Sequence, residues 1–334
     1  MPPTLPRIAI TMGDPAGVGP EICLRALASA EIREIATAVV FGDAAVLRHC
    51  AAVTGLPEPR CIVREARWSQ NFASLNEPAV LDLPGFNATD FNPGTVSGST
   101  GAAAYRYIQK SITAAVDLEV QAVVTAPINK EALRAAGIDF PGHTEIFASA
   151  TRARRACMFQ FSKEVCASFV TVHVGYSEVP ALISTDRILD VIELTAAALQ
   201  RIHGRPPRLA VLGLNPHAGE HGLFGNREEE RFIIPAIQTA RQRGYEIEGP
   251  LPPDTAFIPA KRRVIDGFIC MYHDQGHIPL KALAFDSAVN TTLGLPIVRT
   301  SVDHGTACDI AWQAKADPGS LFAAIKLAAK LSAS

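Results

Sequence analysis

The segment Gly267-Phe-Ile-Cys-Met-Tyr-His273 runs from a short apolar stretch directly into a histidine. An apolar run of this length, ended by a polar turn, predicts a strand that is buried on both faces. Similar runs occur at residues 8–12, 38–41, 122–125, 169–174, 209–214, 268–271 and 296–298. Helical stretches with apolar residues three and four positions apart lie between them, at 20–27, 101–116, 188–202, 231–243 and 321–331. This alternation predicts an α/β chain with a largely parallel sheet, covered by helices on both faces.

Composition and charge restrict the class of function. The 334 residues are 48% hydrophobic and 19% charged, which is typical of a well-packed protein of two α/β domains. A formal net charge of -2 gives no general basic surface for nucleic acid. No apolar run approaches the roughly 20 residues needed to cross a membrane, and the N-terminus lacks the pattern of a signal peptide. We therefore expect a cytoplasmic protein that acts on small molecules, with its seven cysteines as buried thiols.

One stretch lacks a clear period. Residues 54–100 are rich in Pro, Gly, Asn and Ser. We expect irregular surface structure or short antiparallel pieces there.

Histidines follow three of the predicted strands. The segments are Ser168-Phe-Val-Thr-Val-His173, Arg208-Leu-Ala-Val-Leu-Gly-Leu-Asn-Pro-His217 and the segment that ends at His273. Ligands of open parallel sheets bind outside the carboxyl ends of the strands, so these imidazoles are expected to converge. Three neutral imidazoles with one open position make a catalytic site for zinc or a similar divalent ion. The alternative is that each histidine only hydrogen-bonds loop backbone, but the threefold repetition favours a metal site.

His277 lies four residues after His273, a spacing that would place both imidazoles on one face of a helix. Gly276 and the Pro279 that follows oppose a helix at this point. We therefore expect His273 to be the ligand and His277 to orient a loop. Asp274 and Glu220 are candidate acceptors that would fix an imidazole tautomer.

Two further segments indicate anion binding. In Pro141-Gly-His-Thr-Glu145, backbone N–H groups and the Thr144 hydroxyl can receive a phosphate or carboxylate at a helix N-terminus. A capping box formed by Thr144 and a nearby acid is an equal alternative. Lys281, Asn290 and Arg299 accompany an apolar stretch in which unpaired polar groups are costly to bury, so a bound anion or a carboxylate of the protein would stabilise them. Lys281 beside a metal can also serve as a general base.

The loop Gly13-Asp-Pro-Ala-Gly-Val-Gly-Pro-Glu21 joins the first predicted strand to a helix that Pro20 can start. It lacks the G-x-G-x-x-G order of dinucleotide-binding loops. A tight turn is therefore the alternative to a nucleotide loop, with Asp14 or Glu21 facing the site.

Over almost its whole length the sequence resembles the 4-hydroxythreonine-4-phosphate dehydrogenase (PdxA) family, which includes phosphothreonate and terephthalate dihydrodiol dehydrogenases. The motifs that carry the resemblance are Gly13-Asp-Pro-Ala-Gly-Val-Gly-Pro-Glu21, Gly142-His-Thr-Glu145, Asn215-Pro-His-Ala-Gly-Glu220, Gly249-Pro-Leu-Pro-Pro-Asp254, Met271-Tyr-His-Asp-Gln-Gly276 and Thr300-Ser-Val-Asp-His-Gly-Thr-Ala307. Several long motifs in one order make this resemblance specific.

The resemblance implies a role for each candidate residue. His173, His217 and His273 would bind one divalent metal, Zn²⁺ first and Co²⁺, Mg²⁺ or Mn²⁺ as alternatives, with one histidine supplied by the other subunit of a homodimer. The residues that would bind substrate are His143, Thr144, Lys281, Asn290 and Arg299. Lys281 and Asp254 would be catalytic.

The family is similar in turn to the isopropylmalate and isocitrate dehydrogenases, whose adenosine-binding loop resembles His304-Gly-Thr-Ala-Cys-Asp-Ile-Ala311. This likeness implies two α/β/α domains with a cleft between them. Residues 1–128 and 287–334 would form the cofactor-side domain, and residues 129–286 the domain for metal, substrate and dimerisation. NAD or NADP would contact Gly13, Asp14, His304, Gly305, Thr306 and Asp309. The chain departs from the usual glycines at Trp312-Gln313-Ala314.

The expected activity is a metal-dependent, NAD(P)-linked oxidation of a hydroxy acid, followed by decarboxylation. The first candidate substrate is 4-phosphooxy-L-threonine, of pyridoxal phosphate biosynthesis. The enzymes of that pathway tend to carry Leu-Pro-Leu after the first metal histidine, whereas this chain has Val174-Gly-Tyr-Ser-Glu178. 4-Phospho-D-threonate, 4-phospho-D-erythronate and terephthalate 1,2-cis-dihydrodiol are therefore alternatives. The His143-Thr144 pair, which terephthalate-type relatives lose, favours a phosphorylated substrate.

Two other classes of protein could use the same residues. A zinc hydrolase or aldolase would need the three histidines and no nicotinamide. A catalytically silent metabolite-binding protein would keep the fold alone.

Overall fold

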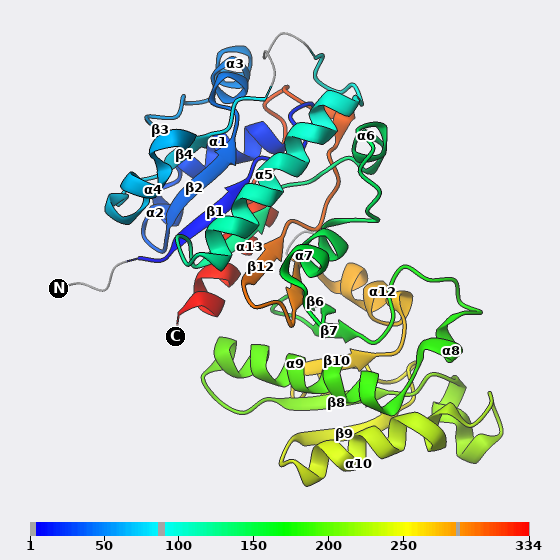
Figure 1. The fold of residues 1–334 in the computed structure, drawn as a ribbon. Helices are drawn as coiled ribbons and strands as arrows, with labels where there is room; N and C mark the ends of the chain where they lie inside the picture. The colour runs from blue at the N-terminus through cyan, green and yellow to red at the C-terminus, as the bar shows by residue number, and fades with distance from the viewer. Residues whose placement is uncertain (1–4, 86–90, 285–287, 334) are drawn as a thin grey trace. The chain divides into compact units, whose positions relative to one another are not determined.

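The computed structural model of the protein describes residues 5–85, 91–284 and 288–333. Alternating strands and helices divide into two compact units (Figure 1). Unit 1 comprises Met1–Ala153 and Leu295–Ser334, and unit 2 comprises Arg154–Gly294.

These limits differ from the expected domain boundaries, because residues 129–153 belong to unit 1 instead of the second domain and residues 288–294 belong to unit 2 instead of the first. The physical reason is packing, because the helices α6 (Lys130–Ala135) and α7 (His143–Thr151) lie against the long helix α5 (Gly98–Val116) of unit 1.

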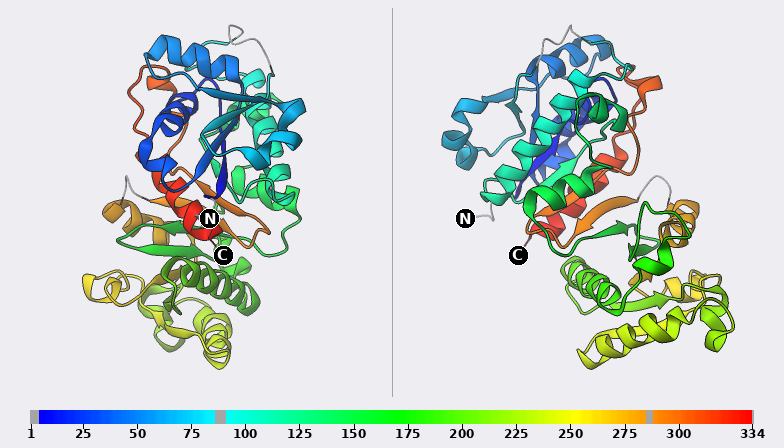
Figure 2. Two further views of the ribbon diagram at one scale, coloured as in Figure 1. Left: turned by 90° about the vertical axis from the view of Figure 1, so that its left-hand side faces the viewer. Right: turned by 45° about the vertical axis from the view of Figure 1, so that its right-hand side comes forward.

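Unit 1 is built on a wholly parallel set of strands in the order β3-β4-β2-β1-β5-β12. Its elements are β1 (Arg7–Thr11), α1 (Gly19–Ala28), α2 (Ala30–Arg33), β2 (Thr37–Gly42), α3 (Ala44–Thr54), β3 (Cys61–Arg64), α4 (Trp68–Asn71), β4 (Ala79–Asp82), α5 (Gly98–Val116), β5 (Ala122–Thr125), α6 (Lys130–Ala135), α7 (His143–Thr151), β12 (Val298–Ser301) and α13 (Gly319–Ser332), with short 3₁₀ turns η1, η2 and η5. Helix α1 contacts α3 and α13, and helix α5 contacts α6 and α7 (Figures 1 and 2).

The central strands of unit 1 are almost wholly buried because helices cover both faces. Every residue of β2 and β5 is buried, as a parallel sheet between two helix layers requires. The predicted strands at 8–12, 38–41 and 122–125 are therefore confirmed. The expectation for residues 54–100 was wrong in part, since β3 and β4 lie there, with β4 parallel to β2 and β3 parallel to β4. The two strands are only four residues long and each ends in a charged residue, so they are too short for a period to be read against the surrounding prolines and glycines.

Unit 2 has the strand order β11-β6-β7-β10-β8-β9. Strand β6 runs antiparallel to both of its neighbours, and the remaining pairs are parallel. Its elements are β6 (Cys157–Phe161), β7 (Cys166–Phe169), α8 (Val179–Leu182), α9 (Thr185–His203), β8 (Arg208–Leu212), the turn η3 (Pro216–Gly222), the π-helix η4 (Glu229–Ile233), α10 (Ile234–Gln242), β9 (Glu246–Leu251), α11 (Pro259–Arg262), β10 (Gly267–Cys270), α12 (His273–Ala284) and β11 (Val289–Leu293).

Strand β10 shows how unit 2 is layered. Ile269 and Met271 pack in one hydrophobic cluster with residues of α9 and α10, whereas Phe268 and Cys270 pack in a second cluster with Leu280 of α12. Successive side chains of a strand point to opposite faces, so helices cover both sides of this sheet. The predicted class, α/β with a largely parallel sheet, is confirmed for both units.

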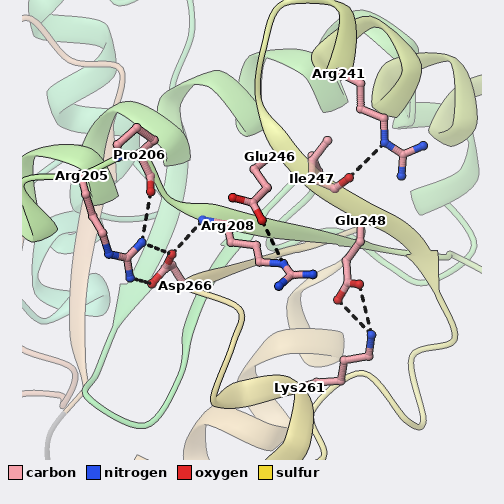
Figure 3. Close-up of polar contacts among 9 residues, drawn as sticks. All are labelled: Arg205, Pro206, Arg208, Arg241, Glu246, Ile247, Glu248, Lys261 and Asp266. Carbon is pink, nitrogen blue, oxygen red and sulfur yellow. Dashed lines mark hydrogen bonds and ion pairs between the residues drawn. The ribbon is translucent and has the colours of Figure 1, made fainter.

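The outer strand of unit 2, β9, is shielded by charged side chains (Figure 3). Glu246 pairs with Arg208 at 3.4 Å, and Glu248 pairs with Lys261 at 3.0 Å. The Nε of Arg241 donates to the carbonyl oxygen of Ile247 at 3.0 Å. Such exposed ion pairs add little stability, but charges along an outer strand hinder its pairing with another chain.

Across the described residues, no helix is both long and apolar enough to cross a bilayer. All seven cysteines are free thiols, and only Cys61 and Cys308 are partly exposed.

Candidate functional site

Each of the three predicted metal histidines follows the carboxyl end of one of three adjacent parallel strands of unit 2, so all three lie toward the same edge of the sheet. Strands β7, β10 and β8 are neighbours in that order, and His173, His273 and His217 follow their carboxyl ends. The structure brings the rings of His173 and His273 to a centroid distance of 5.8 Å. His217 is exposed and its ring lies 6.1 Å from that of Phe224. Within the described part of a single chain, no three metal-binding side chains form a group that could hold an ion.

His273 and His277 lie on one face of a helix, so the expectation of a loop at this point was wrong. Helix α12 begins at His273 and continues past Pro279. Gly276 does not interrupt the helix, which packs closely against its neighbours at this residue. A Cβ there would lie 2.7 Å from the Phe169 ring and 2.8 Å from the Cys270 sulfur. Gln275 fixes the helix start, since its amide accepts from the N–H of Met271 and donates to the carbonyl of Gly213. Tertiary contacts thus outweigh the weak helix propensity of Gly and Pro.

Two neighbours fix the orientation of the His273 ring: Asp274 by a hydrogen bond and His277 by stacking. Asp274 Oδ1 lies 2.7 Å from His273 Nδ1, so a proton on Nδ1 leaves the Nε2 lone pair for a metal. The His277 ring stacks on that of His273 at 3.8 Å and 9°, and on Phe169 at 4.5 Å. We infer that His277 Nδ1 donates to the carbonyl of His273 at 3.0 Å, which leaves Nε2 to accept from Gln160 at 3.3 Å. His277 therefore packs against the candidate ligand and does not replace it.

A cavity of about 270 Å³ opens beside this pair. His173, His273 and Asp274 line it, together with Tyr176 and Tyr272. The Tyr176 hydroxyl donates to Asp274 Oδ2. The hydrogen bonds from Tyr176 and His273 lower the pKa of the Asp274 carboxyl. Asp274 is thus a stable anion next to the imidazole.

His217 lies in a loop with unusual backbone conformation, here called the His217 loop (residues 213–226). Residues 217–221 all have positive φ, between 43° and 79°. Left-handed backbone costs about 1–2 kcal/mol for each residue other than glycine, so the loop needs compensating contacts.

Glu229 provides such contacts to the His217 loop. Its side chain is buried, and Oε1 accepts from the backbone N–H groups of Leu214 at 2.9 Å and Asn215 at 2.8 Å. The Asn215 amide donates both to Glu229, at 3.0 Å, and to Glu228, at 2.9 Å. Burial opposes ionisation of Glu228, but hydrogen bonds from Asn215 and Asn226 outweigh it and lower its pKa.

Three of the predicted substrate residues lie in unit 1, and we call His143, Thr144 and Arg299 the anion cluster. Arg299 is 1% exposed; it donates to Thr125 Oγ1 at 2.7 Å, and its guanidinium lies 5.5 Å from the centre of the Phe147 ring. Burial lowers the pKa of Arg299 to about 9, against an opposing effect of Glu145.

The anion cluster has the chemistry of an anion site. Burial, followed by the charges of Arg299 and Lys130, lowers the pKa of His143 well below its usual value. Its Nε2 is buried and has no hydrogen-bond partner among the described residues. An anion bound here would accept a hydrogen bond from this nitrogen and offset the two positive charges. His143 and Thr144 open helix α7, whose N-cap is Gly142, so the capping-box alternative for Thr144 is wrong.

The other predicted substrate and catalytic residues lie in unit 2. Lys281 is on α12, eight residues after His273. Asn290 is on β11 opposite Gln160 of β6, and its Oδ1 is buried without a partner among the described residues. Asp254 is exposed in the turn after β9.

The two predicted cofactor loops are both in unit 1 and bind to each other. The N–H of Val18 donates to the carbonyl of Thr306 at 3.0 Å. Asp14 accepts from the N–H of Ala16 at 2.9 Å and from Thr100. Burial raises the pKa of Asp14, and these hydrogen bonds only partly oppose the rise. Gly13 has φ 74° and no room for a Cβ, which would lie 2.3 Å from the Pro127 carbonyl oxygen.

Gly13 and Asp14 thus have structural roles, and contact with a cofactor remains a prediction for them. His304 and Gly305 are exposed, and open space surrounds Gly305. The later loop is therefore more open to solvent than the earlier one at these positions. Asp309 is also exposed.

Trp312 and Ala314 occupy positions that suit glycine. Both have φ 60°, which is strained for residues with a Cβ. Trp312 is nevertheless buried, with His49 and Phe91 against its ring and its Nε1 donating to the Pro15 carbonyl at 3.1 Å. This packing compensates for the backbone and ties the second cofactor loop to the first.

Sequence reasoning missed two features of the site. Tyr176 was noted only as a departure from a family pattern, and nothing in the sequence indicates that it reaches Asp274. The second feature is the support of the His217 loop by Glu228 and Glu229. The available signal for it was a pair of adjacent acids at the start of an apolar helical stretch.

The Pyridoxal phosphate biosynthetic protein PdxA family matches residues 34–328. A Geobacter metallireducens protein named 4-hydroxythreonine-4-phosphate dehydrogenase is 42% identical over 332 residues, 99% of this chain and 97% of the relative. A Salmonella typhimurium protein named D-threonate 4-phosphate dehydrogenase is 44% identical over 329 residues, 97% of this chain and 98% of the relative. The crystal structure of 4-hydroxythreonine-4-phosphate dehydrogenase from Klebsiella pneumoniae has a TM-score of 0.84 and 39% identity, covering 98% of this chain and 99% of that one.

These relatives define the class of the chain, which is a dehydrogenase with an α/β fold. More specifically, the chain belongs to the PdxA family, as the motifs had indicated.

Proposed function

We propose that this dehydrogenase oxidises a phosphorylated hydroxy acid with NAD or NADP in a metal-dependent reaction and then decarboxylates the product. The observation that carries the proposal is the pair His173 and His273 beside a cavity, with the Nδ1 of His273 held by Asp274. An imidazole fixed by a carboxylate in this way is the donor that Zn²⁺ and similar ions prefer.

The metal would be held by His173, His217 and His273. Since a single chain does not bring all three together, we propose that a second copy in a homodimer supplies one of them. Zn²⁺ is the first candidate, and Co²⁺, Mg²⁺ or Mn²⁺ are alternatives. A divalent ion at this point would polarise the substrate hydroxyl and later the carbonyl oxygen next to the departing carboxylate.

The remaining roles fall to side chains of the chain itself. Lys281 would take the hydroxyl proton, and Asp254 would orient the substrate. The anion cluster would bind the phosphate, because a buried guanidinium and an orphaned imidazole nitrogen are stabilised by an anion. Lys281 and Asn290 would also bind the substrate. The exposed backbone of His304 and Gly305 would receive the adenosine part of the nicotinamide cofactor, with Thr306 and Asp309 beside it.

4-Phosphooxy-L-threonine is the first candidate substrate, on the resemblance to relatives named 4-hydroxythreonine-4-phosphate dehydrogenase. 4-Phospho-D-threonate is the second, because a relative named for D-threonate 4-phosphate is equally similar. The segment Val174-Gly-Tyr-Ser-Glu178, which departs from the B6-pathway pattern, also favours this second candidate.

A substrate screen tests the proposal. The purified protein with Zn²⁺ and NAD⁺ is offered 4-phosphooxy-L-threonine, 4-phospho-D-threonate, 4-phospho-D-erythronate and terephthalate dihydrodiol, while NADH absorbance at 340 nm and CO₂ release are measured. We expect equal amounts of NADH and CO₂ from one of the first two acids. Absence of NADH from all four, with NADP⁺ and the other metals also tried, would favour a hydrolase or aldolase instead.

A further inference from the structure

Tyr176 joins two parts of the histidine site that are far apart in sequence. It lies in the loop after β7 that also carries His173, whereas Asp274 is on α12 next to His273. The Tyr176 hydroxyl donates to Asp274 Oδ2, and the other oxygen, Oδ1, is bound by His273 Nδ1 at 2.7 Å. One carboxylate therefore connects the phenol to the imidazole.

The two hydrogen bonds have different consequences. The bond to His273 selects the tautomer and leaves Nε2 for a metal. The bond from Tyr176 occupies the second oxygen, so the carboxylate of a side chain that is 43% exposed cannot rotate freely. It also ties the loop of His173 to the helix of His273, and so maintains the 5.8 Å separation of the two rings.

Packing alone gives Tyr176 little reason to adopt this position. The residue is 67% exposed, and its ring makes only an edge contact with Tyr272, at 5.8 Å and 83°. Little apolar surface is removed from water, so the hydroxyl is the part of the side chain with a specific partner.

We propose that Tyr176 is a positioning residue of the metal site, acting through Asp274 on His273. The proposal rests on the proposed metal-dependent function and adds a residue that is not itself a ligand. It predicts that loss of one exposed hydroxyl weakens metal binding without affecting the fold.

The test is a metal titration of the full chain, with Co²⁺ in competition with a chelating indicator and the Co²⁺ absorption spectrum as a second readout. Four proteins are compared: wild type, Tyr176→Phe, Asp274→Asn and the double variant. Loss of a hydrogen-bond partner of a metal-binding His typically weakens affinity by about 10–100-fold. We expect this loss for Asp274→Asn and a smaller one, roughly 3–10-fold, for Tyr176→Phe, which acts one bond further away.

The double variant decides whether the two residues act in series. If Tyr176 acts through Asp274, the double variant binds Co²⁺ no more weakly than Asp274→Asn alone. Losses that multiply would overturn the proposal, as would wild-type affinity in Tyr176→Phe. A raised KM for substrate with unchanged Co²⁺ affinity would also overturn it, because Tyr176 would then contact the substrate directly.

Tyr272→Phe is the matched control, since Tyr272 lines the same cavity but makes no hydrogen bond to Asp274 among the described residues. Tyr272→Phe should bind Co²⁺ with an affinity within about twofold of wild type. An equal loss of affinity in Tyr272→Phe and Tyr176→Phe would mean that the loss does not come from the hydrogen bond to Asp274. If the wild-type protein binds no Co²⁺, the proposed metal site itself is wrong. If wild type and Tyr176→Phe bind Co²⁺ equally, only the proposed role of Tyr176 is wrong.

Discussion

His143 illustrates how its surroundings set the state of one side chain. Its Nε2 is enclosed, and Arg299 and Lys130 add positive charge nearby. Burial and these charges both disfavour the imidazolium, so the pKa falls well below 6.5 and His143 is neutral at physiological pH. With His143 neutral, Arg299 is the charged member of the anion cluster, and Lys130 adds positive charge nearby.

This state predicts a pH dependence of stability. The unfolded chain protonates His143 below about pH 6.5, whereas the folded chain does not, so the unfolded state binds more protons there. The free energy of unfolding should therefore fall as the pH falls below 6.5, by at most about 1.4 kcal/mol per pH unit from this one group. Above pH 6.5 the contribution is constant.

Urea unfolding of the wild type and of His143→Gln between pH 5 and pH 8 measures this effect. Other titrating groups cancel in the difference between the two proteins. Wild type should lose stability relative to the variant as the solution becomes acidic, and parallel curves would show that His143 is protonated in the folded state.

At this scale the sequence indicated some residues and not others. Arg299 could be predicted because a cation in an apolar segment must find a partner wherever the segment folds. Tyr176 could not, because its partner Asp274 lies 98 residues away and is reached only through the pairing of β7 with β10.

Among the elements, α12 shows packing outweighing local preference. A Gly→Ala change inside a helix normally stabilises it by about 1 kcal/mol. At Gly276 the added Cβ would overlap the Phe169 ring and the Cys270 sulfur. We expect Gly276→Ala to destabilise the protein by about 1–3 kcal/mol through overpacking.

Thermal unfolding of Gly276→Ala checks this prediction. Gly85→Ala is the control, since the nearest atom to its Cβ would be 3.9 Å away. Equal or greater stability of Gly276→Ala would mean that α12 does not pack closely on β7 and β10.

The His217 loop depends on one buried carboxylate. In Glu229→Gln, one oxygen can still accept from Leu214 and Asn215, but the new NH₂ group faces the Asn215 amide, which is itself a donor. A buried donor left without a partner costs about 1–3 kcal/mol. The variant should lose this much stability, and it should bind metal more weakly because His217 is less well ordered.

Urea unfolding and zinc titration of Glu229→Gln measure the two effects. The exposed Glu164→Gln gives a charge-matched control in the same unit, expected within about 0.5 kcal/mol of wild type. If Glu229→Gln is destabilised but binds zinc with unchanged affinity, the order of the His217 loop does not contribute to metal binding.

The elements that the sequence could predict are those with a strong local pattern. Strand β5 and helix α9 are long or wholly apolar and lie where the pattern placed them. Strands β6, β9 and β11 were not predicted, since their polar residues, such as Gln160 and Glu248, hide the strand pattern. Their pairing depends on neighbours that are distant in the chain.

For the whole molecule, the separation of His217 from the other two histidines has a consequence for assembly. If one imidazole of each metal site comes from the second copy, a dimer of two different variants can contain one intact site. His217→Ala and His273→Ala are each expected to be inactive, but random mixing of their subunits should restore about a quarter of wild-type activity, since half of the dimers are mixed and each mixed dimer has one complete site.

Mixing His173→Ala with His273→Ala is the control, because these two rings are neighbours in one chain. That mixture should remain inactive. If activity returns in the control but not in the first mixture, His173 and His273 of one metal site come from different subunits, and the proposed arrangement is wrong.

The central claim is that His173, His217 and His273 bind one divalent ion. The most direct test is the zinc affinity and stoichiometry of wild type and of the three single alanine variants, by competition with a chelating indicator. We predict one tightly bound Zn²⁺ per chain in wild type and a large loss of affinity in all three variants, each still folded. Wild-type affinity in any one of them would contradict the account.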